Sequence, residues 1–260
     1  MRVIGHPNID AGSNVLLVFE DPPGVVLDLQ GPGIRVVHEF DSIATVVATP
    51  EGEGLLSARG YRIERDDSVK VVGGASYSYD YTRGPASIPL ALQMEWRGWN
   101  AMYPFIIKSL GPVPPSYLSD LRGIGVNITE SSFLGSCAFL VEMRASVIPR
   151  VMELPYVAWV EPFHYVYRLY SDVLQWVADP RNCCLQLVPL GVTARPGVPG
   201  ARLRSDLLSV GAIIRGSYDS SSGSFVDVWA TGPSAYAIGR LDSVRYVVTS
   251  WPVATGPGDP

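Results

Sequence analysis

Charged residues are scarce in this chain of 260 residues. They make up 17% of it, and the net charge is −5 with an isoelectric point near 5.2. So low a charge content disfavours long charged coiled coils and acidic disordered tails. Lysine occurs at only two positions, and no segment gathers arginines into a cluster. The sequence therefore predicts no nucleic-acid-binding surface.

Cysteine and histidine are equally sparse. Three cysteines with one adjacent pair do not form a disulfide framework, and metal sites need several converging ligands. The residues in question are Cys137, Cys183, Cys184, His6, His38 and His164. We expect no metal and no cofactor. We interpret Cys137 and one residue of the pair as small core residues, while the role of Cys183 and Cys184 stays open.

Long apolar runs are absent as well. No stretch approaches the roughly 18 uninterrupted apolar residues of a membrane-spanning helix. The first apolar run, residues 15–19, is too short for the core of a signal peptide and follows Asp10 rather than a basic stretch. We therefore expect no membrane span, and we find no signal-peptide pattern.

What the chain does contain is a repeated order of strand and helix patterns. In the clearest copy, strand patterns cover residues 103–108, 125–129, 137–143 and 156–161, and helix patterns cover residues 116–122 and 146–154. This order, β-α-β-β-α-β within about 65 residues, is that of a ferredoxin-like unit. It also begins a self-similar pair, because Ile124-Gly-Val and Gly211-Ala-Ile follow a predicted helix in the same way.

The same order recurs before and after this copy. The first copy has strand patterns at residues 14–20, 33–40, 43–49 and 61–72 and a helix after Pro50. The third has strand patterns at residues 184–188, 211–215, 224–230 and 244–249, with a Pro/Gly-rich loop expected at residues 191–200. We predict an α+β fold of three tandem ferredoxin-like (βαββαβ) units with antiparallel four-stranded sheets, each with two helices on one face. Leu154 and Leu241 are expected to be buried between helix and sheet.

These repeats predict six segments along the chain. They are a first unit with an N-terminal arm (1–73), a linker (74–101), a second unit (102–170), a short linker (171–181), a third unit (182–250) and a C-terminal tail (251–260). Gly73-Gly74 and Gly84-Pro85 punctuate the first linker. We interpret its tyrosines as cover for a neighbouring domain, with an additional strand or an aromatic binding surface as the alternative.

Several apolar motifs carry a resemblance to a known family. In the first unit they are residues 15–19, residues 36–40 followed by 43–47, and residues 63–66. In the second they are Ile124-Gly-Val, Phe139-Leu-Val and Leu154-Pro-Tyr-Val-Ala-Trp-Val-Glu-Pro162. This pattern resembles the prodomains of subtilisin-like serine proteases, the inhibitor I9-like fold, and the resemblance covers about 200 of the residues.

The resemblance implies a folding assistant and inhibitor whose sheet packs on the protease and whose C-terminal extension enters the active-site cleft. It makes the tail residues Trp251, Val253, Ala254 and Thr255 the candidate binding residues. It also implies a subtilisin-like serine protease as partner and a secreted or cell-surface, hence extracellular, location. The same prodomain-like fold could serve self-association instead.

The catalytic motifs of subtilases do not occur in this chain. There is no serine within Gly-Thr-Ser and no histidine within His-Gly-Thr-His, and Gly31-Pro-Gly33 is a turn rather than a phosphate-binding loop. We therefore expect no enzymatic activity and name no catalytic residue. The alternative function is a structural or assembly subunit, of a surface layer or filament, whose sheet edges pair between copies. An unrecognised enzyme is the least favoured reading.

Overall fold

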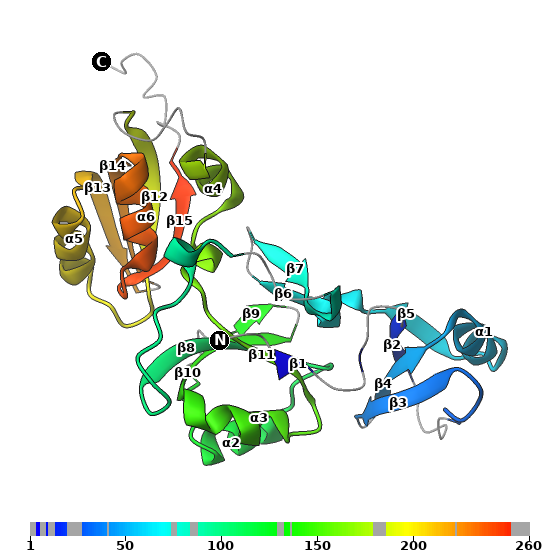
Figure 1. Ribbon diagram of the computed structural model, residues 1–260. Coiled ribbons are helices and arrows are strands. Elements are labelled where there is room, and N and C mark those ends of the chain that lie inside the picture. The colour runs from blue at the N-terminus through cyan, green and yellow to red at the C-terminus, as the bar shows by residue number, and fades with distance from the viewer. Residues whose placement is uncertain are drawn as a thin grey trace. The chain divides into compact units, whose positions relative to one another are not determined.

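The structure is a computed structural model that describes residues 4–5, 9, 14–19, 28–40, 42–73, 77–83, 88–128, 133–135, 137–178, 186–221 and 223–250. Contacts divide the chain into two compact units. Unit 1 contains Met1–Val72, Tyr79–Ala86 and Trp96–Phe163, and unit 2 contains Gly73–Ser78, Ser87–Glu95 and His164–Pro260. The fold is α+β, as expected, and the described residues form six α-helices and four sheets (Figure 1).

The first sheet of unit 1 has the strand order β3-β4-β2-β5 and is antiparallel throughout. Its elements are β2 (Asn14–Phe19), β3 (Ile34–Glu39), β4 (Ile43–Ala48), α1 (Pro50–Ala58) and β5 (Arg62–Arg65). Helix α1 begins where predicted because Thr49 accepts a hydrogen bond from the Gly52 amide and Pro50 fills the first turn.

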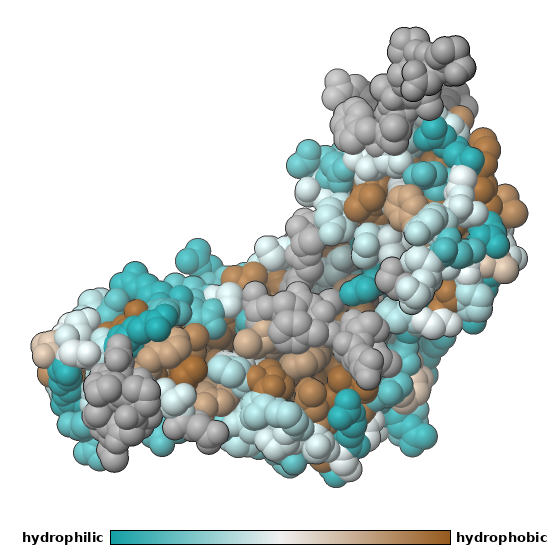
Figure 2. All heavy atoms as spheres, turned by 180° about the vertical axis from the view of Figure 1, so that it is seen from behind, coloured by the Kyte–Doolittle hydropathy of each residue, from teal (hydrophilic) through white to brown (hydrophobic). Residues whose placement is uncertain are grey.

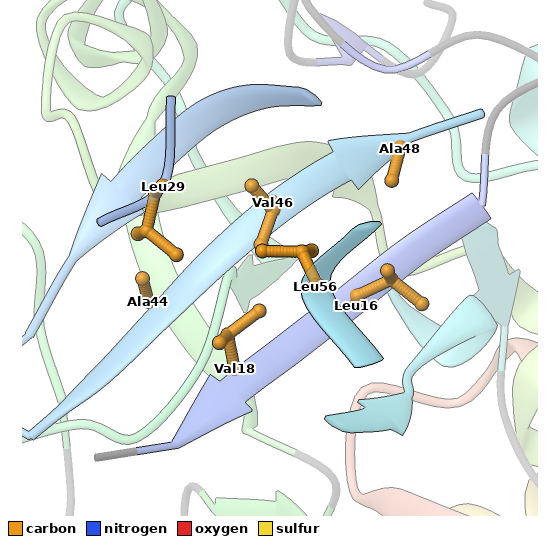
Figure 3. Packing of buried hydrophobic residues seen from close by; sticks show 7 residues of the cluster. All are labelled: Leu16, Val18, Leu29, Ala44, Val46, Ala48 and Leu56. Atoms are coloured by element: carbon orange, nitrogen blue, oxygen red, sulfur yellow. The ribbon is translucent and has the colours of Figure 1, made fainter. Parts of the chain in front are cut away.

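Helix α1 covers a small apolar core on one face of this sheet (Figure 3). Leu56 projects from the helix onto the strands and is fully buried. The other buried members of the cluster are Leu16, Val18, Leu29, Ala44, Val46 and Ala48. Burial of each leucine or valine side chain supplies on the order of 1.5–3 kcal/mol, so this cluster contributes substantially to the stability of the sheet and its helix.

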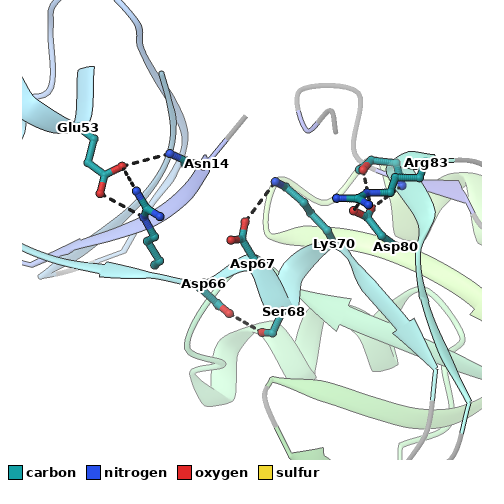
Figure 4. A network of polar contacts seen from close by, with 10 residues as sticks. Asn14, Glu53, Asp66, Asp67, Ser68, Lys70, Asp80 and Arg83 are labelled. Carbon is teal, nitrogen blue, oxygen red and sulfur yellow. Dashed lines mark hydrogen bonds and ion pairs between the residues drawn. The ribbon is translucent and has the colours of Figure 1, made fainter. Parts of the chain in front are cut away.

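Polar contacts fasten the rim of the same sheet (Figure 4). Glu53 of α1 accepts hydrogen bonds from Asn14 of β2 at 3.1 Å and from Arg65 of β5 at 2.8 and 3.1 Å. The bond from Arg65 is the main reason that the pKa of Glu53 lies below its ordinary value. Further along the chain, Lys70 pairs with Asp67 at 3.1 Å.

The second sheet of unit 1 has the order β1-β11-β8-β10-β9. Its strands are β1 (Ile4–Gly5), β8 (Met102–Ser109), β9 (Phe133–Gly135), β10 (Ala138–Arg144) and β11 (Val157–Pro162), and its helices are α2 (Pro115–Gly123) and α3 (Ile148–Met152). The arm assigned to the first predicted unit supplies β1, which pairs with β11 instead.

The sheets of unit 1 are joined by direct contacts. The hydroxyl of Thr45 donates to the carbonyl of Leu110 at 2.9 Å, and the indole of Trp159 donates to the carbonyl of Val69 at 2.8 Å. Both side chains are buried. Val69 belongs to a short 3-10 helix, Asp67–Lys70, between β5 and the strand β6 (Val71–Gly73), which pairs with β7 (Ser78–Asp80).

Unit 2 contains one four-stranded antiparallel sheet with the order β13-β14-β12-β15. Its elements are α4 (Ser171–Ala178), β12 (Val188–Ala194), α5 (Gly200–Ser209), β13 (Ile213–Ser220), β14 (Gly223–Ala230), α6 (Gly232–Arg240) and β15 (Val244–Thr249). Helix α4 lies within the segment 171–181 that the sequence suggested was a linker.

Two strand predictions were wrong. The strand expected at residues 184–188 is instead β12, which begins at Val188 and continues through a segment that we expected to be a Pro/Gly-rich loop. Gly191 suggested a turn, but it serves a close approach inside the sheet, as described below. Of the strand expected at residues 125–129, the described residues 125–128 form only one isolated bridge, between Asn127 and Glu142.

The expected burial of Leu154 and Leu241 was also wrong, since both are only half-buried. Leu154 lies in the turn after α3, and Leu241 caps the end of α6. The buried apolar side chains within the two helices are Ile148 and Val151 in α3 and Ala235 and Ile238 in α6. The buried side chains of each helix therefore lie at least three residues before the leucine that the sequence suggested.

Candidate functional site

Strand β14 alternates buried and half-buried side chains along its whole length. The buried members, Val226 and Val228 among them, face α5 and α6, whose Leu203 and Ile238 are fully buried (Figure 1). Because successive side chains of a strand point to opposite faces, the residues between them point away from the helices. One face of this sheet is therefore left uncovered by α5 and α6.

The strand register shows which residues share this face. Trp229 lies opposite Ile213 of β13 and Pro189 of β12, and Phe225 lies opposite Tyr218 of β13. Directly opposed residues in antiparallel strands lie on the same face. On β15, Tyr246 lies opposite Thr193 of β12 and Val248 lies opposite Gly191, so both belong to the same face. We call the resulting set the open face: Pro189, Gly191, Thr193, Ile213, Tyr218, Phe225, Asp227, Trp229, Tyr246 and Val248.

Gly191 makes the open face continuous. A Cβ atom at this position would lie 2.6 Å from the ring of Phe225 and 3.1 Å from a methyl group of Val248. The side chains of Phe225 and Val248 therefore extend across the glycine from the strands on either side. Absence of a side chain at this point lets apolar side chains of β14 and β15 meet across β12. Asp227 lies opposite Gly191 on the same face, where its carboxylate accepts a hydrogen bond from the Ser250 hydroxyl at 2.7 Å.

The margins of the open face are polar or accessible. The guanidinium of Arg215 lies over the ring of Trp229 at 4.7 Å, a cation–π geometry. Ile213 and Tyr218 are 53% and 68% exposed. Figure 2 shows hydrophobic residues at the surface of this part of the chain. Aromatic side chains and Arg are enriched at protein-binding surfaces, and this face carries both together with the carboxylate of Asp227.

One end of β13 is anchored to helix α5. Asp219 lies against Gly200, the first residue of α5, where a Cβ atom would be 2.0 Å from its carboxylate. Hydrogen bonds from Ser224 and Arg204 hold the pKa of Asp219 below its ordinary value. A carboxylate at a helix N-terminus is also favoured by the helix dipole. These contacts orient the strand that carries Ile213 and Tyr218.

The buried ionisable groups of unit 2 have structural roles. The ring of His164 is 5% exposed and accepts a hydrogen bond from the Met94 amide at 3.0 Å. Burial lowers its pKa from 6.5 to about 4, so the ring is neutral at pH 7. Arg168 donates to the carbonyl of Leu241 at 2.6 Å, next to the end of α6, and burial lowers its pKa to about 10.

A second cluster lies in unit 1 around Lys108. Its ammonium is buried and donates to the hydroxyl of Ser68 at 3.2 Å, and burial lowers its pKa. Burial likewise raises the pKa of the Cys137 thiol, which disfavours the nucleophilic thiolate. Among the residues that the structure describes, no three His, Cys, Asp or Glu side chains come together as a metal site.

The tail residues that the sequence suggested as binding residues, Trp251, Val253, Ala254 and Thr255, lie outside the described residues. Strand β15 ends at Thr249, just before them. The open face, by contrast, was missed. Its signal was the alternation of aromatic and apolar residues in residues 224–230, but only the register reveals which other strands complete the surface.

Comparison with known proteins adds no functional assignment. No family model matches the chain, and no curated protein matches it. None of the helices that the structure describes is long and apolar enough to cross a membrane. The open face and its surroundings therefore provide the chemistry on which a functional proposal can rest.

Proposed function

We propose that the chain is a non-catalytic protein-interaction module of three ferredoxin-like units that binds a subtilisin-like serine protease, inhibiting it or assisting its folding. The strand orders support the three-unit interpretation. Read across each of the three larger sheets, the strands are the second, third, first and fourth of that sheet in chain order. The second sheet of unit 1 has β1 as one more edge strand. A helix follows the third strand in all three.

The observation that carries the proposal is the open face. Trp and Tyr side chains contribute disproportionately to protein–protein binding, because they bury large areas with few rotatable bonds. Trp229 is flanked by Ile213 and Pro189 on a pleated sheet whose other face is held rigid by α5 and α6. A rigid, half-exposed aromatic surface of this kind suits docking against the helices of a globular partner.

The test is inhibition of a panel of subtilisin-like proteases by the full chain and by two matched variants. Trp229→Ser removes the centre of the open face, and Trp99→Ser removes an exposed tryptophan of unit 1 as the control. If Trp229 is a binding hot spot, its loss should cost about 2 kcal/mol of binding free energy, so Trp229→Ser should inhibit about 30-fold more weakly than the full chain. The Trp99→Ser variant should inhibit as well as the full chain. Failure of the full chain to inhibit any protease at micromolar concentration overturns the proposal.

Deleting residues 251–260 separates the open face from the tail. If the tail enters the protease cleft, as the family resemblance implies, the deleted chain should bind without inhibiting. If the deleted and full chains inhibit equally well, the tail has no role in inhibition, and the open face is the inhibitory surface. The binding role proposed for the tail would then be wrong for Trp251, Val253, Ala254 and Thr255.

A structural or assembly role is the second candidate, and strand β13 favours it. This strand is at the edge of its sheet, is eight residues long and has exposed side chains along most of its length. Uncovered edge strands can pair with a second copy through their free backbone groups. Sedimentation of the purified chain distinguishes the two roles, because an assembly subunit should form concentration-dependent oligomers and an inhibitor should remain monomeric.

A further inference from the structure

A cavity of about 440 Å³ lies in unit 1, where the turn between β3 and β4 meets the segment between β8 and α2. The residues that matter for its chemistry are Glu39, Phe40 and Ile43 from the first side and Pro112, Pro114 and Tyr117 from the second. It belongs to different sheets from the open face, so it is a separate site.

The aromatic wall of this cavity is held in place by its own neighbours. Tyr117 stacks on Tyr156 with ring centroids 3.7 Å apart and planes 4° from parallel, and its hydroxyl lies 2.8 Å from Nε2 of His38. The ring of His38 meets the ring of Phe40 edge-on at 4.6 Å. A ligand that contacts Phe40 and Tyr117 therefore meets side chains whose conformational freedom is already lost, which favours binding.

The second support of Phe40 is a glycine. A Cβ atom on Gly111 would lie 2.8 Å from the ring of Phe40, so the ring rests directly on the backbone after β8. Close by, Thr45 donates to the carbonyl of Leu110. The two sides of the cavity are thus tied together by short contacts beneath it, and Phe40 and Tyr117 stand 6.1 Å apart, centroid to centroid.

The charge of the cavity selects for a cation. Glu39 is exposed and is the one charged side chain among the described residues that line it. Within the described part of the chain, Glu39 has no ion-pair partner. Faces of Phe and Tyr attract cations, and a carboxylate beside them adds a direct charge partner.

We propose that this cavity binds the guanidinium group of an arginine side chain presented by a partner protein. A guanidinium is planar, stacks on aromatic rings and matches a carboxylate with two parallel N–H donors, whereas an ammonium is more strongly hydrated and lacks the flat face. Phe40 and Tyr117 supply the stacking surface, and Glu39 supplies the carboxylate. The proposal is independent of whether the partner is a protease.

The test is a titration of the full chain, followed by NMR, with N-acetyl-arginine amide and its neutral isostere N-acetyl-citrulline amide. A single side chain should bind with a dissociation constant on the order of 1–10 mM. A third titration uses N-acetyl-lysine amide. The expected result is saturable shifts at Phe40 and Tyr117 with the arginine compound, at least about fivefold weaker binding of the lysine compound, and no binding of the citrulline compound.

Two glutamine variants localise the charge. Glu39→Gln should weaken binding of N-acetyl-arginine amide by at least about fivefold, and Glu51→Gln on α1 should leave it unchanged. Phe40→Leu should weaken it similarly, and unchanged amide spectra elsewhere show that each variant is folded. Equal binding of the citrulline compound, or equal binding by Glu39→Gln, overturns the proposal, as does the lack of any saturable shift up to about 50 mM.

Discussion

The sheets β3-β4-β2-β5 and β13-β14-β12-β15 share a strand order. They differ in how deeply the side chains on the second face, the face that points away from the helices, are buried. In β4, five consecutive residues from Ala44 to Ala48 are buried, so both faces of the first sheet are covered at this central strand. In β14, buried and half-buried residues alternate from end to end. Strand order alone therefore does not decide whether a sheet keeps a surface for binding.

The cause of the difference can be traced to individual contacts. Thr45 points away from the core under α1, and its hydroxyl donates to Leu110 beyond the end of β8, so a neighbouring segment occupies that face. Val15 and Val47, which oppose each other on the same face, are likewise buried. In the sheet of unit 2, the equivalent layer holds Phe225 and Trp229, which are only half-buried.

The sharpest test of this comparison is a pair of aspartate substitutions. Val47→Asp places a carboxylate on the buried second face of the first sheet, and Val248→Asp places one on the open face. Burying an unpaired charge should cost more than about 4 kcal/mol at the first site, against less than about 1.5 kcal/mol at the second. Denaturant unfolding monitored by hydrogen exchange of the backbone amides in β2–β5 and in β12–β15 measures the loss of stability of each sheet. Similar losses at the two sites would show that the open face is not open.

A smaller effect on stability should distinguish His164 of unit 2 from His38 of unit 1. The folded pKa of His164 is about 4 against 6.5 when unfolded, so the unfolded chain binds more protons between these values. Stability is therefore lost as pH falls from about 6.5 to about 4, by at most about 3 kcal/mol. His164→Gln, which keeps an acceptor for the Met94 amide, should flatten this dependence.

His38 provides the comparison for that experiment. Burial also lowers its pKa, while the Glu39 carboxylate opposes the shift, and the ring is only half-buried. Its contribution has the same sign, with stability lost as pH falls below the ordinary histidine value, but it should be smaller. Denaturant midpoints measured from pH 7 to pH 4 decide the point. Should His38→Gln flatten the profile more than His164→Gln, the assignment of the pH dependence to unit 2 is wrong.

The sequence predicted the parts of the fold that depend on local pattern. The β-branched segment at Ile43 and the proline after Thr49 place β4 and α1 correctly, because strand propensity and helix capping act over a few residues. The strand at Val188 was misplaced because a glycine inside a strand resembles a turn unless the ring of Phe225 that covers it is known.

The candidate sites depend on distant residues and were therefore hidden. Trp229 and Ile213 are brought together by a strand register with a bulge, and Phe40 and Tyr117 by the meeting of two sheets. No spacing along the chain encodes either pair. The tail is a continuous segment, so the family resemblance alone was enough to suggest it as a binding segment. Its residues lie outside the described part of the chain.

A moderate effect is expected where the covered sheet meets its neighbour. Thr45→Val keeps the shape of the side chain but removes the donor to the buried carbonyl of Leu110, which should cost about 1–2 kcal/mol. Thr193→Val makes the same change on the open-face side of β12 and should stay within about 0.5 kcal/mol. Urea midpoints of the two variants measure the difference, and equal values would mean that the Thr45 hydrogen bond does not contribute to the coverage of the first sheet.

The smallest effect on stability is expected at the margin of the open face. Ile213 is 53% exposed, so Ile213→Thr loses little buried area, and threonine keeps the β-branched shape that strands favour. The unfolding free energy should change by less than about 0.5 kcal/mol. Any concentration-dependent oligomer seen in sedimentation should nevertheless weaken, because Ile213 lies on the uncovered edge strand β13 next to Trp229. A stability loss above about 1.5 kcal/mol would mean that Ile213 is buried, and β13 would then be a covered strand like β4.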